Sequence, residues 1–382
     1  MKLRKQHPVW ITDMGVVTGL GDTPDDLWES LLAGKSAIRP VQRFSADNYH
    51  SGVASCISGL SASGQASMIH DLLDRLLPEK GRIPSDSHLI TATTKAGIDY
   101  LERSHQGEAA DSQDLLLSSF PCTVSQKLGL TDTGINISAA CASSTIAVAR
   151  GAARIASGRT EAVLICCADL VTEFVFSGFS CLRALSPVPC QPFDRKRCGL
   201  SLGEGAAFLL LMCEDRARQE GRSHLGSVLG WGAANDATHI TAPARDGCGL
   251  VQAIHQALTV GGVGPEKIAA ISAHGTGTVY NDLMEVTAFQ QVFGDAKIPI
   301  HSVKGAIGHT LAAAGGIEVA LGTKMLSEQL IPPTVGFSDP EAGAAGWVCA
   351  ESAAISGDCL LTTNSGFGGI NAAIILRKGG AA

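Results

Sequence analysis

The sequence lacks any apolar run of the roughly 20 residues that a membrane-spanning helix needs. It also lacks an excess of basic residues, since 29 Lys and Arg stand against 36 Asp and Glu. The net charge of −7 gives no global cationic field for nucleic acid or an anionic membrane. The basic start, Met1 to His7, leads into Pro8-Val-Trp-Ile and not into the apolar segment of a signal peptide. We therefore expect a cytoplasmic location, with no nucleic-acid partner and no membrane span.

Cysteine pairs with the spacing of metal ligands are missing as well. None of the 12 cysteines forms a Cys-x-x-Cys pair. This spacing argues against structural zinc and indicates reduced thiols, most of them in the core. Aromatic residues make up only 5% of the chain, whereas glycine contributes 44 of the 382 residues. The core must therefore use small side chains, which let helices and strands approach one another closely.

The length of 382 residues predicts two to three domains of about 150 residues each, or one duplicated unit. Apolar runs bounded by turn residues alternate with helical patterns, which predicts an α/β fold with a largely parallel sheet. The predicted segments are strands at 9–17, 134–139 and 162–168 and helices at 25–33, 143–156 and within 89–101, the last ending near Leu101.

A weak internal repeat relates two glycine bends, each followed by a buried apolar strand. They are Gly203-Glu-Gly-Ala-Ala-Phe-Leu-Leu-Leu and Gly369-Ile-Asn-Ala-Ala-Ile-Ile-Leu. The repeat predicts two similar halves, residues 1–220 and 221–382, with the charged stretch from Arg218 to Gly226 as connector. Chance is the alternative, because Gly-Ala-Ala before apolar residues is common in a chain of this composition.

Cys141 follows a strand-like segment and small side chains, and it directly precedes the helix predicted to end near Gly158. A thiol at such a turn faces the positive end of the helix dipole, which favours the thiolate. A backbone N–H at the same turn can serve as an oxyanion donor. A catalytic nucleophile is therefore one interpretation of Cys141, and a buried structural thiol is the other.

Two histidines stand in glycine-rich loops. His274 follows a short apolar strand and leads into Gly-Thr-Gly-Thr278, whose residues suit contacts to a polar ligand. His309 shares a loop with Lys304, and the small-residue helix that follows carries Glu318, a possible counter-charge for a buried Lys304.

Metal binding by Cys141, His274 and His309 is a competing interpretation. It is disfavoured because neither histidine lies in a paired ligand motif and no carboxylate or second thiol stands at ligand spacing.

Together these motifs resemble the Cys-His-His set of β-ketoacyl-acyl-carrier-protein synthases, the decarboxylating condensing enzymes of the thiolase fold. The resemblance runs from Trp10 to Asn371 and includes Pro192-Phe-Asp, Gly203-Glu-Gly-Ala and Ala273-His-Gly-Thr-Gly-Thr. It implies a thiolase-like α/β fold in which two pseudo-repeated halves form a five-layer αβαβα sandwich. The nucleophile would come from the first half and both histidines from the second.

The resemblance also implies a reaction. Cys141 would take an acyl group from the phosphopantetheine thioester of an acyl carrier protein, with the N–H groups of Cys141 and Phe367 as oxyanion hole. His274 and His309 would stabilise the enolate that forms when malonyl-carrier protein loses carbon dioxide. Neutral imidazoles are needed, so activity should fall as the pH drops through about 6.5. No cofactor or metal is implied, because the carrier-bound thioester supplies the activation.

Other residues acquire roles only through the resemblance. Lys304 and Glu318 match the pair that fixes the His309 loop, and Phe367 matches an aromatic gate to the acyl chain. Three threonines match positions that contact the pantetheine or malonyl arm: Thr241, Thr276 and Thr278.

Two stretches depart from the family pattern. The interval between Leu101 and Cys141, which in the family caps the acyl pocket and contributes to the dimer, is short. Farther on, Cys198 replaces an acidic residue that would pair with Arg197 or a neighbouring charge, and Leu200 replaces a phenylalanine, which would open space beside the acyl channel. These changes favour a specialised synthase of polyketide or polyene biosynthesis over a housekeeping enzyme of fatty acid biosynthesis.

The implied partners are an acyl carrier protein and a second ketosynthase chain, in a homodimer or in a heterodimer with a paralogous chain-length factor. Because carriers are acidic, a basic patch would dock one, for which the sequence offers Arg183, Arg195, Lys196 and Arg197. Solvated surface charges are the other interpretation of these four residues.

Two alternatives to the active synthase stay open. A chain-length or scaffolding subunit commonly replaces the nucleophile, which this chain retains. A thiolase uses a second late cysteine, and a coenzyme-A-primed initiating synthase uses His and Asn. Here Cys349 and Cys359 lie outside the loop at Gly366, and both histidines are present.

Overall fold

The computed structural model describes residues 7–341 and 343–380, so the basic start from Met1 to His7 lies outside the described residues except for His7. Ten strands form one sheet in the order β11-β10-β14-β15-β9-β1-β8-β6-β4-β5. The strands of the first half are β1 (Val9–Thr18), β4 (His88–Ala92), β5 (Ile135–Ile137), β6 (Ala162–Asp169) and β8 (Gly205–Cys213). Those of the second half are β9 (Gly226–Asn235), β10 (Ile268–Ser272), β11 (Ile300–His301), β14 (Cys359–Gly366) and β15 (Ile370–Lys378).

The two sets of strands have the same topology. In the first half β8 pairs antiparallel with both β1 and β6, and β6, β4 and β5 run parallel. In the second half β15 pairs antiparallel with both β9 and β14, and β14, β10 and β11 run parallel. The strands β8 and β15, which follow the two glycine bends, therefore occupy equivalent positions, and the predicted duplication is confirmed.

The halves meet edge to edge through β1 and β9, where Trp10 lies opposite Ser227 and Ile11 lies opposite Gly226. The prediction of a largely parallel sheet was only half right, because the first and last strand of each half add antiparallel pairs. The last helix before this junction is α7 (Glu214–Gln219), and β9 begins at Gly226. The exact boundary at residue 220 stays a prediction.

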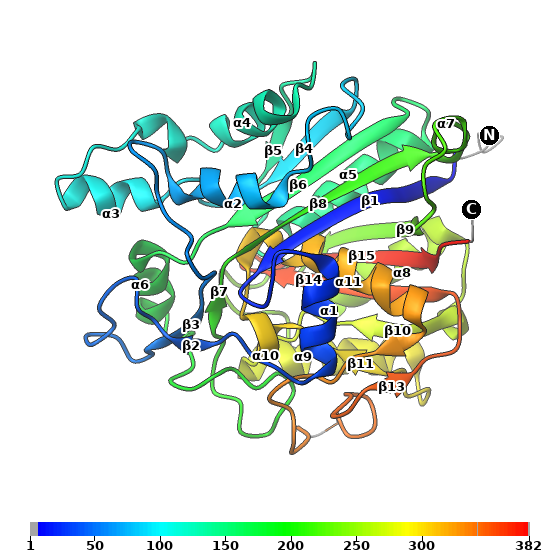
Figure 1. The fold of residues 1–382 in the computed structure, drawn as a ribbon. Helices are drawn as coiled ribbons and strands as arrows, with labels where there is room; N and C mark the ends of the chain where they lie inside the picture. The colour runs from blue at the N-terminus through cyan, green and yellow to red at the C-terminus, as the bar shows by residue number, and fades with distance from the viewer. Residues whose placement is uncertain (1–6, 342, 381–382) are drawn as a thin grey trace.

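Helices cover both halves in five layers (Figure 1). Next to the first half of the sheet, α2 (Met68–Leu76) and α4 (Ser119–Leu128) share one hydrophobic cluster with it. Between the halves lie α5 (Ser143–Ala156) and α11 (Ala314–Glu328), which with α1 (Pro24–Leu32) form the central cluster. On the far side, α8 (Cys248–Gly261) and α9 (Val279–Phe293) pack against the second half. This arrangement agrees with the predicted αβαβα sandwich.

Shorter elements complete the described chain. They are β2 (Arg39–Pro40), β3 (Val53–Ser55), β7 (Leu202–Gly203), β12 (Leu330–Ile331), β13 (Ala353–Ala354), α3 (Asp99–His105), α6 (Glu173–Cys181), α10 (Lys304–Ile307), η1 (Ser112–Leu115), η2 (Pro265–Lys267) and η3 (Leu311–Ala313). No helix within residues 7–341 and 343–380 is both long and apolar enough to cross a membrane.

Small residues let α5 and α11 approach closely, as the composition predicts. A Cβ atom on Gly315 would lie 2.0 Å from Thr145 Oγ1, and one on Gly316 would lie 2.4 Å from Cys167 Sγ. Since real Cβ contacts are longer than 3 Å, neither position on α11 can carry a side chain without moving its neighbours. The helix after the nucleophile and the helix after His309 are thereby held against each other.

The segment 89–101, in which the sequence predicts a helix ending near Leu101, is a strand and a turn over most of its length. Residues 89–92 belong to β4, and the helix α3 begins only at Asp99. Between them a turn is held by Asp169, whose carboxylate accepts hydrogen bonds of 2.7 Å from the hydroxyls of Thr93 and Thr94. Nearly all of β4 is buried, so its residues show no alternation of apolar and polar positions and give no periodic signal for a strand.

Candidate active site

Cys141 lies in the short connection between β5 and α5, where the sequence places it. The preceding residue, Ala140, has a φ of 48°, a left-handed conformation that costs a non-glycine residue about 1–2 kcal/mol. Gly366 comes so close that a Cβ atom there would lie 3.0 Å from the Cys141 backbone N. The strained backbone and the missing side chain together expose the Cys141 N–H and sulfur to the same small space.

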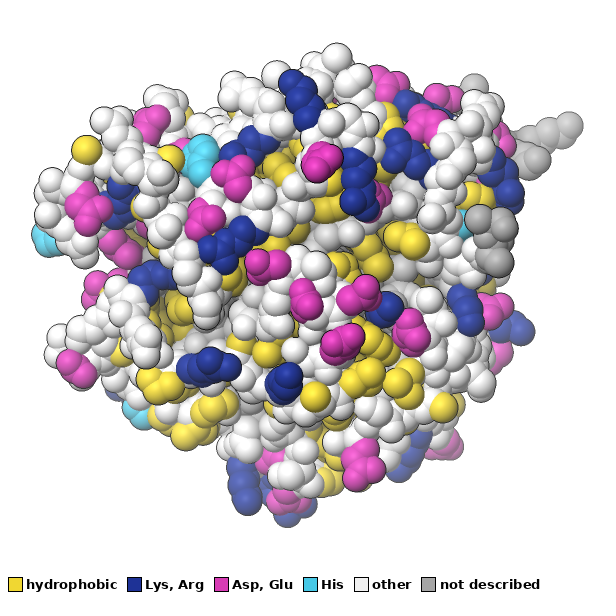
Figure 2. Space-filling view, in the orientation of Figure 1, with side chains coloured by type: hydrophobic (Ala, Val, Ile, Leu, Met, Phe, Trp, Pro, Cys, Tyr) yellow, Lys and Arg dark blue, Asp and Glu magenta, His cyan; other side chains and the backbone are white. Residues whose placement is uncertain are grey.

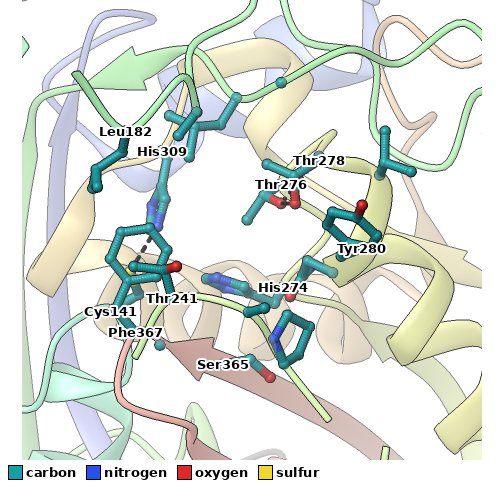
Figure 3. A pocket seen from close by; sticks show the side chains of 18 of the residues that line it. Cys141, Leu182, Thr241, His274, Thr276, Thr278, Tyr280, His309, Ser365 and Phe367 are labelled. Carbon is teal, nitrogen blue, oxygen red and sulfur yellow. Dashed lines mark hydrogen bonds between the residues drawn. The ribbon is translucent and has the colours of Figure 1, made fainter. Parts of the chain in front are cut away.

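The side chains of Cys141, His274 and His309 come together across the two halves (Figure 3). His309 Nε2 lies 2.9 Å from Cys141 Sγ, and the His274 and His309 rings are 5.1 Å apart at an interplanar angle of 84°. All three side chains are buried. The predicted grouping of Cys141 with both histidines is therefore what the structure displays.

Neighbouring donors fix the tautomer of each imidazole. The Leu311 backbone N–H donates to His309 Nδ1 over 3.2 Å. The Asn364 side-chain amide lies 3.1 Å from His274 Nδ1 and donates to Glu318 over 2.7 Å, so its nitrogen faces both groups. With both Nδ1 atoms accepting, the hydrogen of each neutral ring is assigned to Nε2. Both histidines can therefore donate from Nε2 to one ligand atom.

Burial keeps the histidines neutral. It lowers the pKa of His274 well below its usual value, and the nearby Lys304 ammonium and His309 add to the effect. Burial and Lys304 lower the pKa of His309 in the same direction. The sequence-based expectation that the neutral form is lost near pH 6.5 therefore needs correction, because these imidazoles stay neutral at more acidic pH.

The helix dipole predicts a Cys141 thiol that ionises readily, and the structure indicates the opposite. Burial raises the pKa of Cys141 to about 11, although Lys304, Lys95 and the Phe367 N–H all act to lower it. Desolvation of the thiolate thus outweighs the favourable charges at this site. Cys141 is therefore a neutral thiol that accepts a hydrogen bond from His309.

Lys304 and Glu318 form the predicted buried pair, with Nζ 2.6 Å from Oε1 and side chains no more than 1% exposed. Burial raises the pKa of Glu318, and the Lys304 ammonium and the Asn364 amide oppose that shift. Asn364 joins this pair to His274, a role that the sequence analysis missed. Its own position is secured by a hydrogen bond from Thr145 on α5.

Two carboxylates of α9, also missed, shape the His274 loop. Glu285 accepts hydrogen bonds of 2.8 and 2.6 Å from the backbone N–H groups of His274 and Gly275. Asp282 accepts from the N–H groups of Thr276 and Gly277 over 3.1 Å. Burial, followed by repulsion from Asp282, raises the pKa of Glu285 to about 8. The loop that presents His274 is therefore wrapped around buried acidic groups.

A cavity of about 450 Å³ is lined by Cys141, His274 and His309. Thr276 and Thr278 line it with their hydroxyl oxygens 2.9 Å apart, and Thr241 lines it from the loop after β9. Leu200 is buried against this same cavity and does not line a second, smaller one that also reaches Cys141. Phe367 lines both cavities and stacks on Phe179 with ring centroids 5.9 Å apart.

The predicted docking residues divide into two groups. Arg197 is only 5% exposed. It donates to the Val279 carbonyl over 2.8 Å and pairs with Glu341, so it is structural and cannot dock a partner. The absent acid at position 198 therefore leaves no unpaired Arg197, and the exposed Cys198 lies 3.2 Å from the Ser186 hydroxyl instead.

Arg183, Arg195 and Lys196 are exposed, as a docking role requires. Figure 2 shows basic and acidic side chains interspersed over one face of the molecule, without a large patch of one sign. Any basic docking surface on that face is thus local, in keeping with the net charge.

The sulfur and the two imidazoles also satisfy the distances of a metal site, since their ligand atoms lie within 4.8 Å of one another. The chemistry of the donors fits a cation less well. Both Nε2 atoms carry hydrogen in the assigned tautomers, and the Lys304 ammonium makes the local field positive. The arrangement suits an anionic oxygen better than a metal ion.

Comparison with known proteins gives the family. Residues 6–86 and 87–217 match the N-terminal domain of the beta-ketoacyl synthases, and residues 225–338 match their C-terminal domain. The chain belongs to the β-ketoacyl synthase family.

Relatives extend over nearly the whole chain. A 3-oxoacyl-[acyl-carrier-protein] synthase 2 of Coxiella burnetii is 28% identical over 98% of this chain and 99% of its own. A chloroplastic 3-oxoacyl-[acyl-carrier-protein] synthase I of Hordeum vulgare is 30% identical over 87% of this chain and 80% of its own.

Solved structures confirm the thiolase-like fold. The ishigamide ketosynthase/chain length factor aligns with a TM-score of 0.88 at 28% identity, covering 98% of this chain and 100% of that one. A ketosynthase in complex with its chain length factor from Xenorhabdus doucetiae aligns with a TM-score of 0.82 at 26% identity, covering 97% and 98%.

Proposed function

We propose that this synthase catalyses decarboxylative Claisen condensation between an acyl chain on Cys141 and a malonyl group on an acyl carrier protein. The observation that carries this proposal is the meeting of a buried thiol with two Nε2–H donors at the end of one cavity. A thiol beside donors aimed at a developing negative charge is suited to acyl transfer and to enolate formation.

In the first half-reaction the Cys141 sulfur attacks the thioester carbonyl carbon of the acyl carrier. The backbone N–H groups of Cys141 and Phe367 stabilise the carbonyl oxygen as it becomes negative. The bond from carbon to the phosphopantetheine sulfur then breaks, and the proton of the Cys141 thiol ends on that leaving sulfur. Because burial keeps the thiol protonated at neutral pH, this proton must leave during the transfer.

In the second half-reaction the malonyl thioester oxygen accepts hydrogen bonds from His274 and His309. The bond to the carboxylate carbon breaks, carbon dioxide leaves, and the electron pair forms an enolate held by the two Nε2–H groups. The enolate carbon attacks the acyl carbon on Cys141, and the bond between that carbon and the Cys141 sulfur breaks. The sulfur leaves as a thiolate and takes a proton from solvent. The product is a β-ketoacyl carrier two carbons longer, and the protein supplies no metal or organic cofactor of its own.

The remaining site residues support these steps. Thr276, Thr278 and Thr241 line the cavity through which the pantetheine arm reaches Cys141. The Lys304–Glu318 pair orients His274 through Asn364. Phe367, shared by both cavities, acts as the gate between the arm and the acyl chain.

The proposed partner is an acyl carrier protein, and the proposed setting is the cytoplasm. We assign the chain to polyketide or polyene synthesis in preference to fatty acid synthesis. The similarity to a ketosynthase paired with its chain length factor supports this assignment and favours a heterodimer with a paralogous subunit over a homodimer. The short interval before Cys141 stays a prediction of where chain length and partner are selected.

The same similarity supports one other function, that of a chain-length or scaffolding subunit without catalysis of its own. Its expected mark is loss of the nucleophile, whereas this chain keeps the complete set of three reacting groups. The active synthase is therefore the better supported function.

The proposal is tested by incubating the purified assembly with acyl- and malonyl-carrier proteins and weighing both protein and product by mass spectrometry. We expect Cys141 to gain the acyl mass and the carrier to gain a β-ketoacyl group. Absence of both across a panel of chain lengths would overturn the synthase. Full product formation by an assembly that carries Cys141→Ala would favour the scaffolding function instead.

A further inference from the structure

A second cavity, of about 350 Å³, also reaches Cys141 and shares Phe367 with the first. Its walls are largely apolar, with Val175, Phe179 and Leu311 among them. It lacks both histidines and all three threonines that line the larger cavity. Under the proposed function the larger cavity takes the pantetheine arm, so the second cavity is left for the acyl chain attached to the Cys141 sulfur.

This apolar cavity contains one lysine. Lys95 is the single charged side chain among the described residues that line it. It stands in the turn after β4, and its backbone N–H donates to Asp169 over 3.2 Å. The same turn is held by Thr93, whose hydroxyl accepts a hydrogen bond of 2.9 Å from the Ala96 N–H. The backbone that presents Lys95 is therefore fixed at the cavity wall.

Among the described residues, the Lys95 ammonium has no acidic partner. Its Nζ donates to the Thr94 hydroxyl over 3.1 Å, and within residues 7–341 and 343–380 no carboxylate lies within 4 Å of it. Asp169, which holds this turn from the end of β6, accepts instead from the Thr94 hydroxyl and from the Ala312 N–H. Since an ammonium has three N–H donors, Lys95 keeps donor capacity that faces the cavity.

An unpaired ammonium in an apolar cavity discriminates between acyl chains. A plain alkyl chain that fills the cavity displaces water from Lys95 and offers no acceptor in return, which is costly for a charged group. A chain with an oxygen at this depth restores the lost hydrogen bond, and a carboxylate does so most strongly. The free-energy cost of desolvating Lys95 therefore falls on the plain alkyl chain. Binding sites reject close analogues by such a penalty on the competing ligand.

We propose that Lys95 is a specificity residue that selects acyl chains bearing an acceptor oxygen, a negatively charged one above all, over plain alkyl chains. This inference rests on the proposed function, since it concerns the chain that Cys141 receives. It adds a substrate class to that function: oxygenated acyl groups in place of saturated fatty acyl groups.

The test measures single-turnover acylation of Cys141 from carrier-bound chains in matched pairs of equal length, one alkyl and one ending in a carboxylate. Intact-protein mass spectrometry follows the acyl enzyme, so condensation is not required. We expect wild type to load the carboxylate-ended member of at least one pair about tenfold faster. A hydroxyl-ended chain should fall between the two.

Two variants of Lys95 separate charge from shape, and a variant of a distant lysine serves as the control. Lys95→Met keeps the unbranched side chain and should abolish the preference by accelerating alkyl loading and slowing carboxylate loading. Lys95→Arg should retain it. Lys35→Met, at an exposed lysine outside the cavity, should match wild type. Lys95→Gln replaces Lys95→Met if thermal unfolding shows that the methionine variant is not folded.

The outcomes distinguish this inference from the function on which it rests. Equal loading of both chains by wild type, unchanged in Lys95→Met, overturns the role of Lys95 and leaves the synthase intact. Failure of wild type to load any chain overturns the proposed function itself. A preference that persists in the folded uncharged variant, Lys95→Met or its replacement Lys95→Gln, assigns the selection to other residues and also overturns the role of Lys95.

Discussion

The two halves of the molecule share one strand topology but contribute to the site in different ways. In the proposed reaction the first half supplies a single reacting atom, the Cys141 sulfur. Backbone positions it, through the left-handed Ala140 and the start of α5 in the first half and through the close approach of Gly366 from the second half. The second half supplies two imidazoles and holds them with buried charge, through Lys304 and its partners. Duplication of a fold therefore preserved the strands while the halves divided the chemistry between them.

This division predicts different consequences of mutation. Because backbone groups position Cys141, few side-chain substitutions in the first half should weaken the site, apart from substitution of Cys141 itself. In the second half each buried ionic group is coupled to its neighbours, so that removing one leaves another unpaired. Changes in the second half should therefore affect decarboxylation and stability together.

The largest difference between the effects on condensation and on acylation is expected for His309→Ala. Removing one oxyanion donor typically costs a factor of about 100–1000 in turnover, so condensation should fall by at least that amount. Acylation of Cys141, which uses backbone donors, should fall much less. Rapid-quench measurement of the acyl enzyme and of the β-ketoacyl product distinguishes the two steps. Equal losses in both would show that the halves do not divide the reaction.

A large effect on stability is expected for Lys304→Ala. The variant leaves Glu318 buried without its counter-charge, which typically costs about 3–5 kcal/mol. Decarboxylation should weaken more than acylation, because the network loses its hold on His274. Denaturant unfolding and the two half-reaction rates measure these effects. Earlier or greater loss of acylation would contradict the positioning role of Lys304.

The pH dependence of decarboxylation should test the two buried histidines of the second half without a mutation. Because burial lowers the pKa of both histidines well below 6.5, decarboxylation should persist into more acidic solution than free imidazole would allow. A rate that is already halved near pH 6.5, measured under saturating substrate, would contradict neutral buried rings.

Glu285→Gln should change how stability depends on pH. The folded-state pKa of Glu285 is about 8, against an ordinary 4.5. The folded protein thus binds more protons at this group than the unfolded chain between those values. Its contribution to stability is full below pH 4.5 and is lost as the pH rises towards 8.

The glutamine variant should therefore lose less unfolding free energy than wild type between pH 5 and pH 8.5. The matched control is Glu29→Gln on an exposed face of α1, which should follow wild type. Identical pH slopes for wild type and Glu285→Gln would show that Glu285 titrates normally.

The smallest effect is expected for Phe367→Gly. Turnover should change only several-fold, but the range of accepted chain lengths should broaden because the stacked ring no longer separates the two cavities. Product chain lengths measured by mass spectrometry test this prediction. An unchanged distribution of product chain lengths would show that Phe367 does not gate the acyl chain.

The sequence predicted that Cys141, His274 and His309 lie together because each stands in a local signal. Cys141 precedes a recognisable helix, and His274 and His309 stand in glycine-rich loops that do not suit a core. The repeat around Gly203 and Gly369 was also a true sign of duplication, since the strands that follow them occupy equivalent positions.

The missed residues act over long separations and leave no local pattern. Asn364 meets His274 across 90 residues, and Glu285 resembles any acidic residue on a helix until its partners are known. Arg197 was misassigned for the same reason. It stands in a run of basic residues that looks solvated, yet its partner Glu341 comes from a distant segment.

The division of the reaction between the halves is tested most directly by decarboxylation without the nucleophile. Cys141→Ala should still release carbon dioxide from malonyl-carrier protein while forming no acyl enzyme and no condensation product. Adding His274→Ala to that variant should remove the release. Absence of carbon dioxide release from a folded Cys141→Ala protein, or release that survives the loss of His274, would contradict the account.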